Sequence, residues 1–224
     1  MKDSDAFDPV SPTDADIAQA SVPPRIELEA VAPEDRARAE FYALLGRLYA
    51  DPPDADLLRA IASAERAPSD SPLGIAWNRL IDASTGLDPR SAAQEYTDLF
   101  VGVGRSEVNL HAAHWDKGFM LDQSLADLRT DLARLGLARR SGATMLEDHL
   151  SALCETMRLL VAARGGRSSP LAVQRAFFDR NIAAWVFRCC NAIAASRFAN
   201  YYAHVAELTS RFMTLERDAL CMED

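Results

Sequence analysis

Residues 144–150, TMLEDHL, place two carboxylates and a histidine directly before an apolar helical stretch. Glu147 and Asp148 can accept hydrogen bonds or attract a cation, and His149 is one of only four histidines in the chain. Thr144 and Glu147 also have the spacing of a capping box, which predicts a helix start with Asp148 in its first turn. A positive imidazole is disfavoured there, so we expect a neutral His149 that makes one hydrogen bond.

His111 and His114 are one helical turn apart, the spacing of two histidines that share a metal ion, with Glu107 or Asp116 as a third ligand. However, HxxH is a common pattern, and the HExxH arrangement of zinc hydrolases is missing. We therefore expect polar residues of a surface or cleft here, and no metal or other cofactor. Trp115 follows in the same segment, among His, Asp and Lys, which indicates a binding surface.

The motifs of covalent and nucleotide chemistry are missing from this sequence. It has neither a GxSxG elbow nor a phosphate-binding GxxxxGKS, and no GxGxxG that follows a strand. The four cysteines form no CxxC pair, which predicts reduced thiols rather than disulfides or a zinc site. We therefore expect no catalytic residue.

The composition indicates an acidic protein that binds basic partners. The 33 Asp and Glu residues outnumber 24 Lys and Arg, for a net charge of −9, which argues against nucleic acid and favours a basic peptide. The acidic first residues do not resemble a signal peptide, and no apolar run reaches the ~20 residues that span a bilayer. These features predict a cytoplasmic protein without membrane insertion.

Residues 1–32 are rich in Asp, Pro, Ser and Ala, and we expect a disordered acidic tail there. From Pro33 to residue 224, apolar residues recur at three- and four-residue steps, and alternating strand patterns are scarce. This pattern predicts one all-α domain, a bundle of about eight or nine helices. Ser71, Asp88 and Ser196 are expected to cap helices, and Gly136 to end one.

Segment 101–120, VGVGRSEVNLHAAHWDKGFM, interrupts the helical pattern with three glycines. A loop of this length inside a compact domain is usually functional or a crossover. Tyr96, Leu99 and Phe100 precede it on one helical face. We expect these three residues to lie in the core, but part of their helical face can also line a binding site enclosed by the loop.

The run at 96–104 has the pattern Y-x-x-L-F-x-G-x-G, and it is followed by segments similar to P-x-x-S-x-Y/W and E-P-x-D-H. In this order the three motifs resemble the TorD/DmsD/NarJ family of redox-enzyme maturation chaperones, over roughly residues 34–220. The stretches VNLHAAHWDKGFM, LADLRTDLARLGLARR, EDHLSALCETMRLL and YYAHVAELTSRFMTLE look most like the branch associated with formate dehydrogenases.

The sequence departs from the family motifs at several positions. Leu110 and Ala113 replace the proline and the serine, and Trp115 holds the aromatic position. Met145 and Leu146 replace the glutamate and the proline, while the Asp148–His149 pair of the motif matches. The losses at 113 and 145 argue against a small ligand such as a guanine nucleotide.

The resemblance implies a TorD-like helical fold that binds the N-terminal segment, often with twin arginines, of an apo molybdoenzyme catalytic subunit. The expected client is a formate dehydrogenase, and a nitrate, dimethyl sulfoxide or trimethylamine oxide reductase is the alternative. The chaperone is a monomer or, by exchange of helices, a homodimer. The residues expected to bind the peptide are Tyr96, Leu99, Phe100, His111, Trp115, Glu147, Asp148 and His149.

Two rival interpretations remain at this point. One is a small helical hydrolase whose metal is held by His111, His114, His149 and a carboxylate. The other is a helical interaction module without client selectivity. The chaperone hypothesis itself depends on one arrangement: the turn that carries Trp115 must lie beside Asp148 and His149, at a surface open to a polypeptide.

Overall fold

The computed structural model describes residues 32–102, 104–115, 121–139, 145–162 and 170–222. Its regular structure in these ranges is helical, apart from one antiparallel bridge between His111 and His149, so the prediction of an all-α domain is confirmed. The elements are α1 (Pro33–Ala50), α2 (Ala55–Ala62), α3 (Pro72–Ser84), α4 (Pro89–Tyr96), η2 (Thr97–Val101), α5 (Ala112–Trp115), α6 (Leu121–Arg134), α7 (Leu150–Val161), α8 (Leu171–Phe178), η3 (Asp179–Ala183), α9 (Val186–Ala195) and α10 (Tyr201–Cys221).

Several helix boundaries follow from local sequence signals. Helix α1 begins at Pro33, and the Ser71 side chain accepts from the amide of Gly74 at the start of α3, as expected. Gly136 follows α6 with a φ of 69°, a left-handed conformation that favours glycine at a helix end. Asp88 is the N-cap residue of α4, although its side chain accepts no bond from a helix amide.

The start of α10 corrects one of these predictions. Ser196 bonds only to the local amide of Phe198, and it does not cap the helix. The carboxylate of Glu95 on α4 instead accepts from the amides of Asn200, Tyr201 and Tyr202, at 2.7–3.1 Å. The α10 helix is therefore capped by a residue about a hundred positions earlier in the sequence. Local sequence patterns cannot predict such a tertiary contact.

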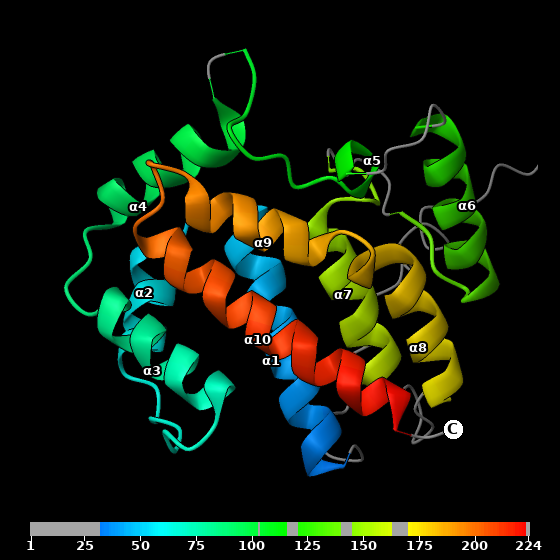
Figure 1. Ribbon diagram of the computed structural model, residues 1–224, viewed down its shortest axis with the longest axis horizontal. Coiled ribbons are helices and arrows are strands. Elements are labelled where there is room, and N and C mark those ends of the chain that lie inside the picture. The colour runs from blue at the N-terminus through cyan, green and yellow to red at the C-terminus, as the bar shows by residue number, and fades with distance from the viewer. Residues whose placement is uncertain (1–31, 103, 116–120, 140–144, 163–169, 223–224) are drawn as a thin grey trace, which may run out of the picture.

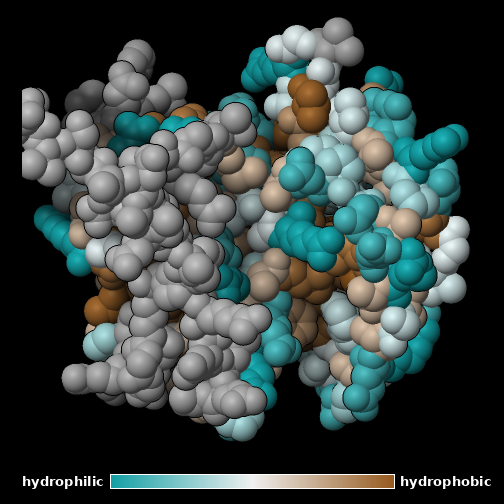
Figure 2. Space-filling view, turned by 180° about the vertical axis from the view of Figure 1, so that it is seen from behind, coloured by the Kyte–Doolittle hydropathy of each residue, from teal (hydrophilic) through white to brown (hydrophobic). Residues whose placement is uncertain are grey.

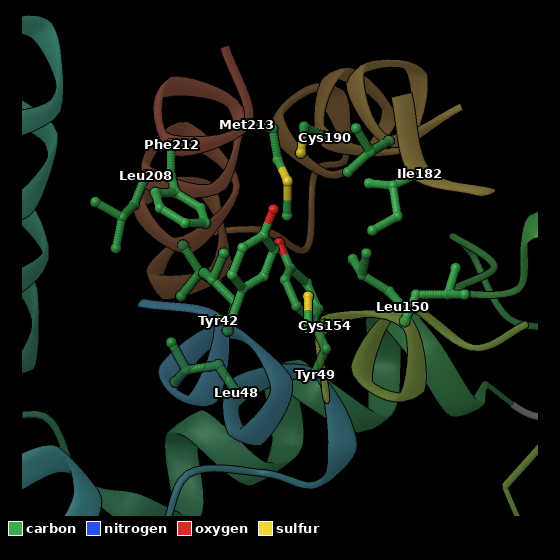
Figure 3. Close-up of a cluster of buried hydrophobic side chains, with 14 of the residues drawn as sticks. Tyr42, Leu48, Tyr49, Leu150, Cys154, Ile182, Cys190, Leu208, Phe212 and Met213 are labelled. Carbon is green, nitrogen blue, oxygen red and sulfur yellow. The ribbon is translucent and has the colours of Figure 1, made fainter. Parts of the chain in front are cut away.

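The core forms where α1 packs along α7, and where α10 packs against α3 and α9 (Figure 1). Tyr42 and Tyr49 of α1 point into this core, beside Phe212 of α10 and Cys154 of α7 (Figure 3). Burial of these large side chains supplies the main stabilising free energy of the fold.

A buried polar network fixes α1 to α10. Glu216, which is 1% exposed, accepts from the Arg38 guanidinium at 2.7 and 2.9 Å and from the Tyr42 hydroxyl at 2.9 Å. The Tyr49 hydroxyl lies 2.9 Å from the Thr209 hydroxyl, which is also buried. The hydrogen bonds of the network offset the desolvation cost of its buried polar groups, and they set the register of the two helices.

Helices α2, α3 and α4 lie at one end of the molecule, and α5 and α6 lie at the other (Figure 1). None of the helices in the described ranges has the length and apolar character that a membrane span requires. Three of the cysteines are buried and Cys221 is exposed, and all four are free thiols, as predicted. Burial raises the pKa of Cys190 to about 12, so this thiol does not become a thiolate nucleophile near neutral pH.

Candidate functional site

The candidate site is built around the carboxylate of Asp148, which is only 4% exposed. One carboxylate oxygen lies 2.8 Å from Nδ1 of His111, and the other accepts from the amide of Ala113 at 3.2 Å. The backbone completes the connection: the Ala112 amide donates to the Asp148 carbonyl, and the Leu150 amide donates to the Leu110 carbonyl. These bonds join two segments that lie 37 residues apart in the chain.

His149 completes this group, which we call the histidine–aspartate corner (His111, Asp148 and His149). Its Nδ1 accepts from the Ser151 amide at 3.2 Å, so His149 caps α7 with its ring. The rings of His111 and His149 meet edge to face, with centroids 4.9 Å apart. Burial, together with the charge of His111, lowers the pKa of His149 to about 4, which favours the neutral ring that the sequence predicts.

The corner corrects the predicted start of α7. The helix begins at Leu150, not near Thr144, which lies outside the described residues, and Asp148 precedes the helix rather than lying in its first turn. His149 has extended backbone angles, φ −68° and ψ 139°, because it pairs with His111 in the β-bridge. The Glu147 carboxylate accepts two bonds from Arg129 of α6, at 3.1 and 3.2 Å.

Charge explains the protonation states of the two carboxylates. Burial alone would raise the pKa of Asp148, but the hydrogen bond and charge of His111 and the Ala113 amide outweigh it, and the pKa lies below its usual value. The hydrogen bond from Arg129 lowers the pKa of Glu147. Both groups are therefore anionic at neutral pH, and both already have cationic or hydrogen-bonding partners.

The segment before His111 is tied down by a few backbone bonds. Gly102 ends η2 with a φ of 64°, and a Cβ there would lie 2.2 Å from the Arg105 carbonyl oxygen, so this tight turn requires glycine. The Val108 amide then donates to the Leu99 carbonyl at 2.8 Å. The segment thus runs from the end of a π-helix, a feature frequent at functional sites, directly to the corner.

Trp115 forms an aromatic wall beside the corner. Its indole N–H donates to the Asn109 carbonyl at 2.9 Å, and its ring stacks on Trp185 with centroids 6.5 Å apart. Arg188 of α9 donates to the Trp115 carbonyl at 2.7 Å, and its guanidinium carbon lies 5.9 Å from the centre of the indole ring. These contacts fix the tryptophan while leaving it partly exposed.

A small polar cavity of about 120 Å³ opens between the corner and α9. Its lining includes Asp148, Trp185, Arg180 and Arg188. Arg180 is held by both carboxylate oxygens of Asp131, at 2.7 and 2.9 Å. The cavity thus presents a carboxylate and two guanidinium groups, a combination that suits the polar groups of a polypeptide.

The predicted site residues fall into two sets. His111, Trp115, Glu147, Asp148 and His149 come together, with Trp115 on the turn beside the corner, while Asp148 and His149 are themselves buried. Tyr96 and Leu99 instead lie in the core, and the partly buried Phe100 packs against it. Leu99 is fully buried, and the Tyr96 hydroxyl donates to the carbonyls of Tyr49 and Ala50.

His111 and His114 do not converge on a common point. The His111 ring turns to Asp148, whereas the exposed His114 packs edge to face on Trp115. In the described ranges, no three His, Cys, Asp or Glu side chains are grouped so that they could hold a metal ion. The hydrolase hypothesis therefore lacks a ligand set among these residues.

Sequence reasoning missed Arg129, Arg180, Arg188 and Trp185 as neighbours of the corner. No local sequence pattern links these four residues to the corner, because they belong to α6, η3 and the start of α9. Trp185 lies in the core, at 3% exposure. It also supports Trp115, a role visible only in three dimensions.

The fold and site define an all-helical protein with a polar, aromatic hollow at the junction of a long loop and two helices. Comparison with known families identifies the class: residues 66–191 match the family model of the nitrate reductase delta subunit. The matched range contains the whole corner and Trp115. The chain belongs to this family of NarJ/TorD-type chaperones, which serve the maturation of molybdoenzymes. A search of curated proteins found no match.

Proposed function

We propose that this protein is a cytoplasmic chaperone for a formate dehydrogenase. It binds the N-terminal segment of the apo catalytic subunit at the histidine–aspartate corner and the Trp115 wall. It keeps the client from premature transport until the molybdenum cofactor and the iron–sulfur centres are in place. The observation that carries the chaperone role is the family match over residues 66–191, which spans both halves of the corner. The choice of client rests only on the resemblance of stretches such as EDHLSALCETMRLL to the formate dehydrogenase branch.

The contacts at the corner suit a polypeptide ligand. Trp115 offers a supported aromatic face, and Arg188 offers an exposed guanidinium beside it. His111, whose side chain is 33% exposed, contacts the Asp148 carboxylate at 2.8 Å. The core position of Tyr96, Leu99 and Phe100 gives them a supporting role under the loop, so the apolar part of the segment contacts Trp115 instead.

Binding is expected to be moderate and reversible. A disordered segment loses conformational entropy when it binds, which lowers affinity and permits release. Asp148 and Glu147 already have hydrogen-bonding partners. A client arginine would therefore contribute only the free energy of additional hydrogen bonds, or the difference between its bonds and those that it replaces.

The test is a titration of the full-length protein with a synthetic peptide from the N-terminus of a formate dehydrogenase catalytic subunit encoded in the same genome. Trp115→Ala removes the exposed aromatic face and should weaken binding roughly tenfold or more, as truncation of a buried aromatic contact does. Asp148→Ala and His149→Ala should also weaken it. Thermal unfolding of each variant separates lost binding from lost structure.

His111→Asn probes the exposed edge of the corner, and its matched control is His204→Asn on α10, away from the corner. The proposal requires that the first substitution weakens binding and the second does not. If the Trp115 and His111 variants, both folded, bind like the parent protein, the corner is not the binding site.

The family description favours a second client, a nitrate reductase. Affinity capture with the tagged full-length protein, followed by identification of the bound subunit, distinguishes the two clients. Capture of a nitrate reductase catalytic subunit would keep the chaperone function and change its client. Equal binding of scrambled peptides would favour a module without selectivity.

A further inference from the structure

An apolar groove of about 420 Å³ lies between α1 and α3, outside the corner. Its floor and walls are formed by Phe41 and Leu44 of α1, Pro68 of the preceding loop, and Leu73 and Trp77 of α3. Figure 2 shows apolar surface between hydrophilic rims on the side of the molecule where α3 lies. The volume is in the range of pockets that hold small ligands, or a few apolar side chains.

Aromatic contacts and a hydrogen bond hold the elements that form the groove in place. The Phe41 ring stacks on Phe212 at a centroid distance of 5.1 Å and meets Trp77 edge to face at 5.9 Å. The Trp77 indole N–H donates to the Glu65 carbonyl at 2.9 Å, which ties α3 to the loop before it. A preformed apolar surface of this kind binds without a large ordering cost.

Asn78 holds the loop wall in place. Its side chain accepts from the Ala67 amide at 3.0 Å and donates to the Ala67 carbonyl at 2.8 Å. Gly74 permits the loop to lie directly against α3, because a Cβ there would come within 2.2 Å of the Pro68 carbonyl oxygen. The wall is therefore a defined part of the fold.

The rim of the groove is acidic. Glu40 and Asp70 both line it, both are exposed, and within the described ranges neither has an ion-pair partner. Residues 33–102, which include both walls, carry twelve acidic and seven basic side chains. A cation at either end of a bound apolar segment would therefore meet a favourable potential.

Charge argues against the two occupants that the chain itself could supply. Residues 1–31 carry seven acidic and two basic side chains, so the tail would bring negative charge to a negative rim. A second copy has a net charge of −9 and would bring the same acidic face. Repulsion disfavours both arrangements.

We propose that the groove between α1 and α3 is a docking site for an apolar segment of another polypeptide that carries a basic residue beside it. The apolar side chains lie against Phe41, Leu44 and Trp77, and the basic residue lies near Glu40 or Asp70. This site is separate from the corner, and its existence does not depend on the proposed function.

The experiment is an NMR titration of the full-length protein, labelled with ¹⁵N, with a synthetic peptide of an arginine pair followed by a short leucine–alanine run. The indole N–H resonance of Trp77, assigned with Trp77→Phe, should shift in a saturable manner, while that of the buried Trp185 should not. The double variant Glu40→Lys/Asp70→Lys should weaken binding roughly tenfold, because it reverses both rim charges.

The matched control is Asp56→Lys/Asp98→Lys, which makes the same change of net charge at exposed or half-buried sites outside the groove. It should bind the peptide like the parent protein, and a peptide with glutamates in place of the arginines should bind more weakly. An unshifted Trp77 resonance, or equal weakening in the two double variants, would overturn the proposal.

Two further outcomes identify a different occupant and would also overturn it. If Ile26→Asp/Leu28→Asp in the full-length chain shifts the Trp77 resonance without peptide, the tail fills the groove. If this resonance shifts with protein concentration alone, a second copy does. A shift of the Trp77 resonance that is kept with Trp115→Ala and lost with Glu40→Lys/Asp70→Lys would support the groove independently of the proposed function.

Discussion

The histidine–aspartate corner and the groove between α1 and α3 are two hollows that the fold builds by different means. The groove is made from helix faces and one short loop, and its floor is apolar. The corner is made from two segments far apart in the chain, and buried polar groups hold it together. The charged side chains that line them differ as well, because Arg180 and Arg188 line the cavity beside the corner, whereas Glu40 and Asp70 line the groove.

Because of this difference, we expect the two hollows to respond differently to substitutions and to pH. Each polar group of the corner depends on its partner, since a buried donor or acceptor without a partner costs free energy. The apolar floor of the groove has no such dependence, because apolar contacts are non-directional. Its walls do depend on polar contacts, through Glu216 for α1 and Asn78 for the loop. We therefore expect the corner to be sensitive to single atoms and to pH, and the groove to respond to charge and volume. Four predictions test this comparison.

The largest effect is expected at Glu216, whose network holds the α1 wall of the groove. Glu216→Ala leaves the buried Tyr42 hydroxyl without its acceptor and removes two bonds of the Arg38 guanidinium, which keeps its bonds to Asp35 and Gln174. The loss should be about 3 kcal/mol of unfolding free energy, as for other broken buried pairs. Urea denaturation measures it. Glu207→Ala on the same helix removes only a partly exposed pair with Arg79 and should cost less than about 1 kcal/mol; similar losses in the two variants would contradict the prediction.

The next effect is expected at Asp148. Asp148→Ala leaves Nδ1 of His111 and the Ala113 amide unpaired and should lower the unfolding free energy by about 2 kcal/mol. Asp148→Asn keeps an oxygen acceptor and should recover part of this loss. Urea denaturation compares the variants, and titration of the groove peptide should give the same affinity for all three proteins. A changed affinity would show that the two hollows are coupled.

The third prediction concerns pH. His149 has a folded-state pKa of about 4 against an ordinary value of 6.5, so the unfolded chain binds more protons between these values. Stability should therefore be highest above pH ~6.5 and fall as the pH decreases towards 4, by at most about 3 kcal/mol from this group. The lowered pKa of Asp148 acts in the same direction at still lower pH.

His149→Asn tests this assignment, because asparagine is also a good N-cap residue but does not titrate. The melting temperature of the variant should match the parent protein near pH 7.5 within a few degrees and decline less between pH 6.5 and pH 4.5. An unchanged decline would assign the pH dependence to other groups.

The smallest effect is expected at Asn78. Asn78→Ala removes both bonds to Ala67 and should cost about 1 kcal/mol, because this loop lies at the surface. Hydrogen exchange at the Ala67 amide should rise, and the affinity for the groove peptide should fall. The exposed Asn191 provides the control, and Asn191→Ala should change none of these quantities.

Much of the fold could be predicted from the sequence because its signals are local. Pro33, the Ser71 cap and the stop at Gly136 act within a few residues, and the helical spacing of leucines places Leu128 and Leu132 of α6 in the core. The same local reasoning failed at 144–150. There the capping-box spacing competes with a β-bridge to His111, and the long-range pairing prevails.

The sequence by itself determined an all-helical chain, reduced thiols, a neutral His149, and a family resemblance carried by residues 96–104 and 148–149. Only the tertiary structure decided that Asp148 bonds to His111 and Ala113, that Glu95 caps α10, and that Leu99 is buried in the core. The physical reason is the range of the interactions. Helix propensity, caps and turns depend on neighbours in sequence, whereas a buried carboxylate finds its partners only when distant segments pack together.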